Sequence, residues 1–316
     1  MTRWFVFACL FFLRVFVHAE DPFYFKNGER IVFLGDSITQ NGLYISYVET
    51  HLLEEYPANQ YTFVNLGLSS ETASGNSEPD HPWPRPCVHT RIDRALALSK
   101  PDWVIVCYGM NDGIYYPFGE ARFSDYVKGV RELIAKIKAV GAKSIVMTPP
   151  PFDVRSRKGP VAPEGLAAYS YKTPYEQYND VLGQYAGWIM SLDGRVDRVV
   201  DIYSPMQKYY DEQHDANPTY SSGDGIHPRA DGHWIIAETL LKRVKAPNVE
   251  KPPYVEEAGS SEIFSKVRAR REKLDAAWRK HVGHGRSKPL PPGSFEQAIR
   301  IAADQKQEIQ KLLKAH

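Results

Sequence analysis

Five residues in four separate segments are of the types that acyl transfer requires: Ser37, Gly67, Asn111, Asp224 and His227. A serine hydroxyl becomes an effective nucleophile only when a histidine accepts its proton. That histidine in turn needs a carboxylate, which fixes its tautomer and stabilises the imidazolium. Asp224 and His227 lie three residues apart in a turn-rich segment, so they could form this pair within one loop.

The tetrahedral intermediate of acyl transfer also needs hydrogen-bond donors that point at its oxyanion. The N–H groups of Ser37 and Gly67 and the side-chain amide of Asn111 are the candidate donors. Each residue is ordinary by itself, because a serine before a helix is a common N-cap and Asn-Asp-Gly is a common turn. Their occurrence in order, at the ends of successive predicted strands or in adjoining loops, favours the catalytic interpretation.

The segments that precede these residues are short, apolar and rich in β-branched or aromatic side chains, as is typical of strands buried on both faces. Segments with helical periodicity alternate with them, which predicts an α/β fold with a parallel sheet of about five strands and helices on both faces. Functional residues of such sheets gather beyond the carboxyl ends of the strands. The predicted strands are Ile31–Leu34, Tyr61–Asn65, Trp103–Cys107, Ser144–Thr148 and Val196–Ile202, and the helices Leu43–Glu55, Arg91–Ser99, Phe123–Ala139, 174–191 and 231–245.

Four blocks of the sequence resemble the SGNH, or GDSL-type, hydrolase family: Gly35-Asp36-Ser37-Ile38, Asn65-Leu66-Gly67, Gly109-Met110-Asn111-Asp112 and Asp224-Gly225-Ile226-His227-Pro228. The resemblance covers about residues 30–245 and implies a flavodoxin-like three-layer α/β/α sandwich with strand order 2-1-3-4-5. It also implies ester hydrolysis without a metal or another cofactor. Ser37 would be the nucleophile, His227 the base and Asp224 its orienting carboxylate. Ser37, Gly67 and Asn111 would supply the oxyanion hole, and we expect Asp36, Asp112 and Tyr115 to bind substrate.

The substrate is less well defined, because members of this family hydrolyse esters of lipids, aryl alcohols, thioesters and acetylated sugars. Aromatic residues in the loops, such as Trp83, Tyr115, Tyr116 and Phe118, could stack on a sugar ring or line an acyl pocket. With no long apolar lid in the sequence, we expect short acyl esters, chiefly acetyl groups on carbohydrates. A lipase, lysophospholipase or thioesterase that acts on longer chains is the alternative.

Two further classes stay open. A metal-dependent phosphoesterase would use Asp36, Asn111, Asp112 and His227 as ligands. A non-catalytic binding module would retain the same scaffold without turnover. The formal net charge of +1 argues against a nucleic-acid partner.

The two ends of the chain differ in character from its middle. Residues 1–19 are typical of a secretory signal peptide, with Arg3 before an apolar run and Val17-His18-Ala19 at the predicted cleavage site. They predict a secreted or periplasmic protein without a stable membrane span after cleavage, although a retained anchor is an alternative because Arg14 interrupts the run. Residues 20–248 would form the hydrolase domain and residues 249–316 a helical extension, with helices at Glu262–Lys280 and Ser294–Lys314.

Several features of the sequence allow more than one interpretation. Cys87 and Cys107 could form a disulfide after export, but the apolar surroundings of Cys107 favour a buried free thiol. His281 and His284 lack nearby acidic or cysteine partners, which favours surface residues over a metal site. The sequence does not predict an oligomeric state.

Overall fold

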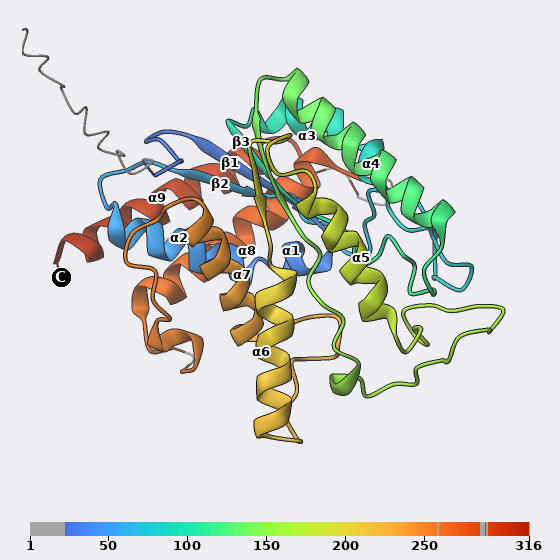
Figure 1. Cartoon of the computed structure of the whole chain (residues 1–316). Helices are drawn as coiled ribbons and strands as arrows, with labels where there is room; N and C mark the ends of the chain where they lie inside the picture. The colour runs from blue at the N-terminus through green and yellow to red at the C-terminus, as the bar shows by residue number, and fades with distance from the viewer. Residues whose placement is uncertain (1–22, 258, 285–287, 289, 316) are drawn as a thin grey trace, which may run out of the picture.

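A five-stranded parallel sheet forms the centre of the computed structural model, which describes residues 23–257, 259–284, 288 and 290–315 (Figure 1). The predicted signal peptide, residues 1–19, lies outside the described residues. The order of the strands in the sheet is β2-β1-β3-β4-β5, and every neighbouring pair is parallel. This confirms the predicted fold class. The strands are β1 (Arg30–Gly35), β2 (Thr62–Asn65), β3 (Trp103–Cys107), β4 (Lys143–Met147) and β5 (Arg198–Val200).

Both faces of the sheet are covered by helices, because alternate side chains of each strand enter different hydrophobic cores. Val32 and Leu34 of β1 pack into the core formed with α3, α4 and α5, whereas Ile31 and Phe33 pack into the core formed with α2, α6 and α7. The first face is covered by α3 (Ile92–Ser99), α4 (Glu120–Ala139) and α5 (Tyr178–Met190), and the second by α2 (Leu43–Glu55), α6 (Tyr203–Ala216) and α7 (Ala230–Arg243).

The remaining elements are short or lie near the C-terminus. Helix α1 (Ser37–Asn41) follows β1 directly, and α8 (Glu262–Val282) and α9 (Ser294–Ala315) follow the sheet domain; single 3₁₀ turns occur at Val88–Thr90, Val154–Ser156 and Pro253–Val255. Helix α6 is not predicted from the sequence, because it buries only Met206, Tyr210 and His214, one residue per turn.

The C-terminal helices pack closely against the sheet domain. Val267, Leu274 and Trp278 of α8 are buried, as expected for an apolar packing surface. Glu49 of α2 forms ion pairs with Arg270 and Arg271 of α8. These charges are buried and paired, which is the condition under which charges are tolerated in an interior. Helix α8 therefore contributes to the interior of the protein.

Other sequence-based expectations are resolved by the fold. Cys87 and Cys107 are both free thiols, and burial raises the pKa of Cys107 well above its usual range. The His281 ring stacks on Phe295, with ring centroids 3.7 Å apart. Within the residues that the structure describes, no helix is long and apolar enough to cross a membrane.

Candidate active site

Ser37 lies at the first turn of α1, immediately after the carboxyl end of β1. The turn is so tightly packed that only a glycine fits at position 35, because a Cβ there would lie 2.3 Å from Thr39 Oγ1 and 2.7 Å from the Cys107 carbonyl oxygen. Asp36 caps the short helix, and its Oδ1 accepts the N–H of Ile38 at 2.9 Å. The Ser37 hydroxyl is thereby held at the edge of the sheet.

A continuous chain of hydrogen bonds connects Ser37, His227 and Asp224. Ser37 Oγ lies 2.8 Å from His227 Nε2, and His227 Nδ1 lies 2.9 Å from Asp224 Oδ2. The second carboxylate oxygen of Asp224 accepts the backbone N–H groups of Ile226 at 2.9 Å and of His227 at 2.7 Å. With a proton on Nδ1 facing the carboxylate, Nε2 is left as the acceptor for the serine proton.

The contact between His227 and Asp224 shifts the pKa of both side chains. The hydrogen bond to Asp224 raises the pKa of His227 above its ordinary value of 6.5, although burial lowers it. Burial alone would raise the pKa of Asp224, but its hydrogen bonds to the His227 side chain and backbone bring that pKa well below its usual range. Asp224 is therefore ionised at neutral pH, where it stabilises a protonated imidazole.

A second, buried polar cluster holds the loop that carries Asp224 and His227. Asp153 Oδ2 accepts hydrogen bonds from Ser156 at 2.5 Å and Ser222 at 2.7 Å and lies 2.9 Å from His214 Nε2. The Asp153 N–H donates to the Gly225 carbonyl oxygen at 2.9 Å. This cluster is not predicted from the sequence, because its members come from three segments that form no recognisable motif.

The Ser37 hydroxyl opens into a cavity of about 230 Å³. Two long loops, residues 69–90 and 149–173, both contribute to its walls. Trp83 lies at the cavity with 41% of its surface exposed. Tyr116, by contrast, packs edge-on against Tyr169. The walls include Ser70, His81, Trp83, Asn111, Tyr115 and Tyr171.

The structure differs from the sequence-based prediction at Gly67. Its N–H is buried and donates to Asn65 Oδ1 at 2.8 Å, so it does not point into the cavity. A glycine is needed there for a different reason, because a Cβ would lie 2.3 Å from the Gln40 backbone nitrogen in α1. Ser70, three residues later, lines the cavity in its place. Its φ of 66° is strained for a residue with a side chain, a feature often found at functional sites.

Asp36 and Asp112 are also placed differently from the prediction that they bind substrate. Both are buried, and burial raises the pKa of each to about 6. Asp36 caps α1, while Asp112 Oδ1 accepts the N–H groups of Ala73 and Ser74, both at 2.8 Å. Both carboxylates bind backbone N–H groups, and neither is among the residues that line the cavity. In the described part of the chain, no group of three or more His, Cys, Asp or Glu side chains is arranged to hold a metal ion.

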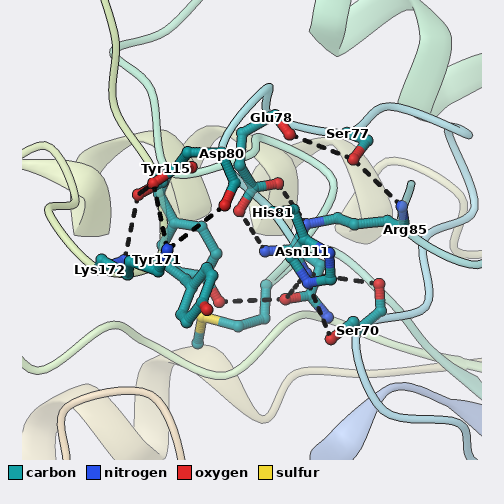
Figure 2. A network of polar contacts seen from close by, with 12 residues as sticks. Ser70, Ser77, Glu78, Asp80, His81, Arg85, Asn111, Tyr115, Tyr171 and Lys172 are labelled. Atoms are coloured by element: carbon teal, nitrogen blue, oxygen red, sulfur yellow. Dashed lines mark hydrogen bonds and ion pairs between the residues drawn. The ribbon is translucent and has the colours of Figure 1, made fainter. Parts of the chain in front are cut away.

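Asn111 and Tyr115 lie together in the cavity wall (Figure 2). Asn111 Oδ1 accepts the Tyr115 hydroxyl at 3.0 Å and Arg85 Nη1 at 2.9 Å. Asn111 Nδ2 donates to the Glu71 carbonyl oxygen at 3.3 Å, which uses one of its two hydrogens. Arg85 had no predicted role, since it lies in a long loop without periodicity.

Comparison with known proteins finds a family whose model matches this chain. The model of the GDSL-like lipase/acylhydrolase family matches residues 33–235, a range that includes Ser37, Asn111, Asp224 and His227. An acetylxylan esterase of Geobacillus stearothermophilus is 26% identical over 239 residues, which cover 69% of this chain and 94% of that protein.

Two solved structures share the fold. A gut microbial diltiazem-metabolizing enzyme is similar with a TM-score of 0.57 and 23% identity, over 70% of this chain and 48% of that chain, so this chain spans about half the length of that enzyme. A catalytic mutant of an acetylxylan esterase from Geobacillus stearothermophilus gives a TM-score of 0.53 at 21% identity, over 72% of this chain and all of that one.

The hydrogen bond between Asp224 and His227 predicts a measurable change in the Asp224→Asn variant. Without the carboxylate, burial becomes the dominant influence, so the pKa of His227 should fall from above 6.5 to below it. Titration of the imidazole signals by NMR measures this pKa, and His51, which bonds to the Pro247 carbonyl oxygen, serves as an unaffected control. An unchanged His227 titration would show that the pair does not form in solution.

Proposed function

We propose that this chain, which belongs to the GDSL-like lipase/acylhydrolase family and is a carboxylic ester hydrolase, uses Ser37 as nucleophile, His227 as general base and Asp224 as the carboxylate that orients His227. The observation that carries this proposal is the hydrogen-bond chain from Ser37 Oγ through both ring nitrogens of His227 to Asp224. The 2.8 Å between Ser37 Oγ and His227 Nε2 is within the range that proton transfer requires, and the 2.9 Å between His227 Nδ1 and Asp224 allows the hydrogen bond that orients the ring.

In the proposed first step, Ser37 Oγ attacks the ester carbonyl while His227 Nε2 takes the serine proton. The imidazolium then protonates the leaving alcohol, and a water activated by the same histidine releases the acid. His227 must be neutral to act as a base, so kcat/KM should fall as the pH drops through its raised pKa.

The oxyanion that forms in these steps needs donors on the opposite side of the carbonyl from the histidine. We assign this role to the N–H groups of Ser37 and Ser70 and to Nδ2 of Asn111, all from residues that line the cavity. Ser70 replaces Gly67 in this assignment because the Gly67 N–H is bonded to Asn65. Among the backbone hydrogen bonds of the described residues, none uses the Ser70 N–H.

For the substrate we propose short acyl esters, chiefly acetyl groups carried by saccharides. A cavity of about 230 Å³ is smaller than the roughly 300–1,000 Å³ of typical ligand pockets, which favours a small acyl group. The exposed ring of Trp83, with Tyr171 nearby in the same wall, offers apolar faces for a sugar. The resemblance to a protein named as an acetylxylan esterase supports the same choice.

We further propose that residues 1–19 are removed on export to the cell exterior or periplasm. The support is the sequence pattern of Arg3, an apolar run and Val17-His18-Ala19. N-terminal sequencing of the protein recovered from its native cells should find a terminus at or near Glu20, and a soluble cytoplasmic protein that retains Met1 would contradict export.

The Ser37→Ala variant should lose ester hydrolysis by about a thousandfold or more, because nucleophile and base act as a unit. Its folding should be intact, since only one hydroxyl is removed from a residue at the cavity surface. Hydrolysis of p-nitrophenyl acetate and thermal unfolding measure the two properties. A variant that folds normally and keeps most of its activity would refute the role of Ser37.

Acetyl esters should be cleaved faster than esters of eight or more carbons. An enzyme with a groove for long acyl chains would instead gain about 0.8 kcal/mol of binding free energy for each buried methylene, so its kcat/KM would rise steeply with chain length. A series of acetyl, butyryl, octanoyl and palmitoyl p-nitrophenyl esters, together with acetate release from acetylated xylan, separates the two cases. A maximum at octanoyl or beyond without acetate release from saccharides would favour a lipolytic enzyme.

A further inference from the structure

A buried ion pair lies beside Asn111, and its arginine, Arg85, forms part of the same cavity wall. Arg85 and Glu78 are only 5% and 2% exposed, and Nε and Nη2 of Arg85 donate to the two Glu78 carboxylate oxygens, each at 2.5 Å. Burial lowers the pKa of Arg85, but the hydrogen bonds that it donates to Glu78 raise that pKa above its ordinary value. The guanidinium is therefore charged and its charge is compensated, so it is poorly suited to recognise an anionic substrate.

The third nitrogen of this guanidinium contacts Ser70 and Asn111, two of the three residues to which we assign oxyanion donors. Arg85 Nη1 donates to Asn111 Oδ1 at 2.9 Å and, more weakly, to the Ser70 carbonyl oxygen at 3.4 Å (Figure 2). The Arg85 guanidinium thus connects the Asn111 side chain with the backbone at Ser70, two parts of the proposed oxyanion hole.

The contact with Arg85 also determines which way the Asn111 amide faces. Asn111 Oδ1 accepts a second hydrogen bond from the Tyr115 hydroxyl, and burial raises the pKa of Tyr115, so this phenol stays a donor at neutral pH. An amide oxygen that accepts from two donors cannot exchange places with its nitrogen without losing both bonds. Nδ2 is then left with one hydrogen for the Glu71 carbonyl oxygen and one for the cavity.

The backbone beside Asn111 is strained in a way that supports this arrangement. Ile114 and Tyr115 both have left-handed backbone conformations, with φ of 47° and 64°, which are strained in residues with side chains. The turn they form brings the Tyr115 hydroxyl to Asn111, four residues back. The Arg85 guanidinium lies 5.5 Å from the centre of the Tyr115 ring, so the two donors also stabilise each other.

We propose that Arg85 is a positioning residue of the oxyanion hole: together with Tyr115 it holds the Asn111 amide with Nδ2 toward the reacting carbonyl and steadies the Ser70 peptide. This inference rests on the proposed function, because it assumes that Asn111 stabilises an oxyanion. Arg85 acts through Asn111, because all three of its guanidinium nitrogens donate to Glu78, Asn111 or the Ser70 carbonyl oxygen. If its contact were lost, the amide could rotate and present its oxygen to the developing negative charge.

A double-mutant cycle tests this dependence on Asn111. Asn111→Ala should lower kcat for p-nitrophenyl acetate by about a hundred- to a thousandfold with little change in KM. Arg85→Met should lower kcat by about ten- to a hundredfold, also at nearly constant KM. Introduced into the Asn111→Ala protein, Arg85→Met should cause a further loss of less than about threefold, because its effect is already gone.

Arg270→Met is the matched control for the loss of a buried arginine. Arg270 is 5% exposed, as Arg85 is, but it pairs with Glu49 of α2 and does not line the cavity. This variant should lose thermal stability to a similar extent while kcat falls by less than about threefold. If both arginine variants lowered kcat equally, the effect of Arg85 would be general destabilisation and the inference would be wrong.

Tyr115→Phe keeps the inference testable if Arg85→Met does not fold, since it removes only a hydroxyl. It should lower kcat by about three- to tenfold at constant KM, and this loss should disappear in the Asn111→Ala background. Fully additive losses in either cycle would overturn the inference while leaving the proposed reaction intact. If the proposed reaction mechanism were wrong, esterase activity would instead survive when Ser37→Ala is introduced into each of these proteins.

Discussion

One hydrogen bond, between Ser37 Oγ and His227 Nε2, joins residues that are 190 positions apart, and the architecture of the domain makes it possible. Ser37 follows β1, which lies between β2 and β3 within the sheet, whereas His227 precedes α7, which packs on the face formed by α2 and α6. The parallel sheet brings the ends of its strands to one edge, so residues distant in sequence meet there. A single 2.8 Å contact then depends on both cores being correctly packed.

The loops that complete this contact are stiffened from within by buried carboxylates. Asp36 caps α1, Asp112 holds the backbone of Ala73 and Ser74, and Asp153 binds Ser156, Ser222 and His214. Asp112 and Asp153 each take part in more than one hydrogen bond, which offsets the cost of their burial. The C-terminal helices extend the same scheme, because Asp275 of α8 accepts from Asn65, which also holds the Thr39 carbonyl oxygen and the Gly67 N–H.

The sequence predicts the strands, their order and the approach of Ser37, Asp224 and His227, because these depend on apolar patterns and on blocks typical of the family. It does not predict which backbone N–H faces the cavity. Gly67 and Ser70 lie in the same loop after β2, and the sequence reveals neither the bond of the Gly67 N–H to Asn65 nor the φ of 66° at Ser70. Arg85 and Asp153 escape prediction because their partners are distant or lie in loops without periodicity. Helix α6 escapes it because its apolar side is narrow.

The central claim is that the Ser37 hydroxyl is the activated nucleophile, and its covalent capture tests this most directly. A fluorophosphonate reacts with a serine only when a neighbouring base and an oxyanion hole activate it. After incubation of the full-length protein with this reagent, peptide mapping by mass spectrometry should find one adduct, on Ser37, formed in step with the loss of esterase activity. Labelling of a different residue, or an active protein that stays unlabelled at Ser37, would contradict the account.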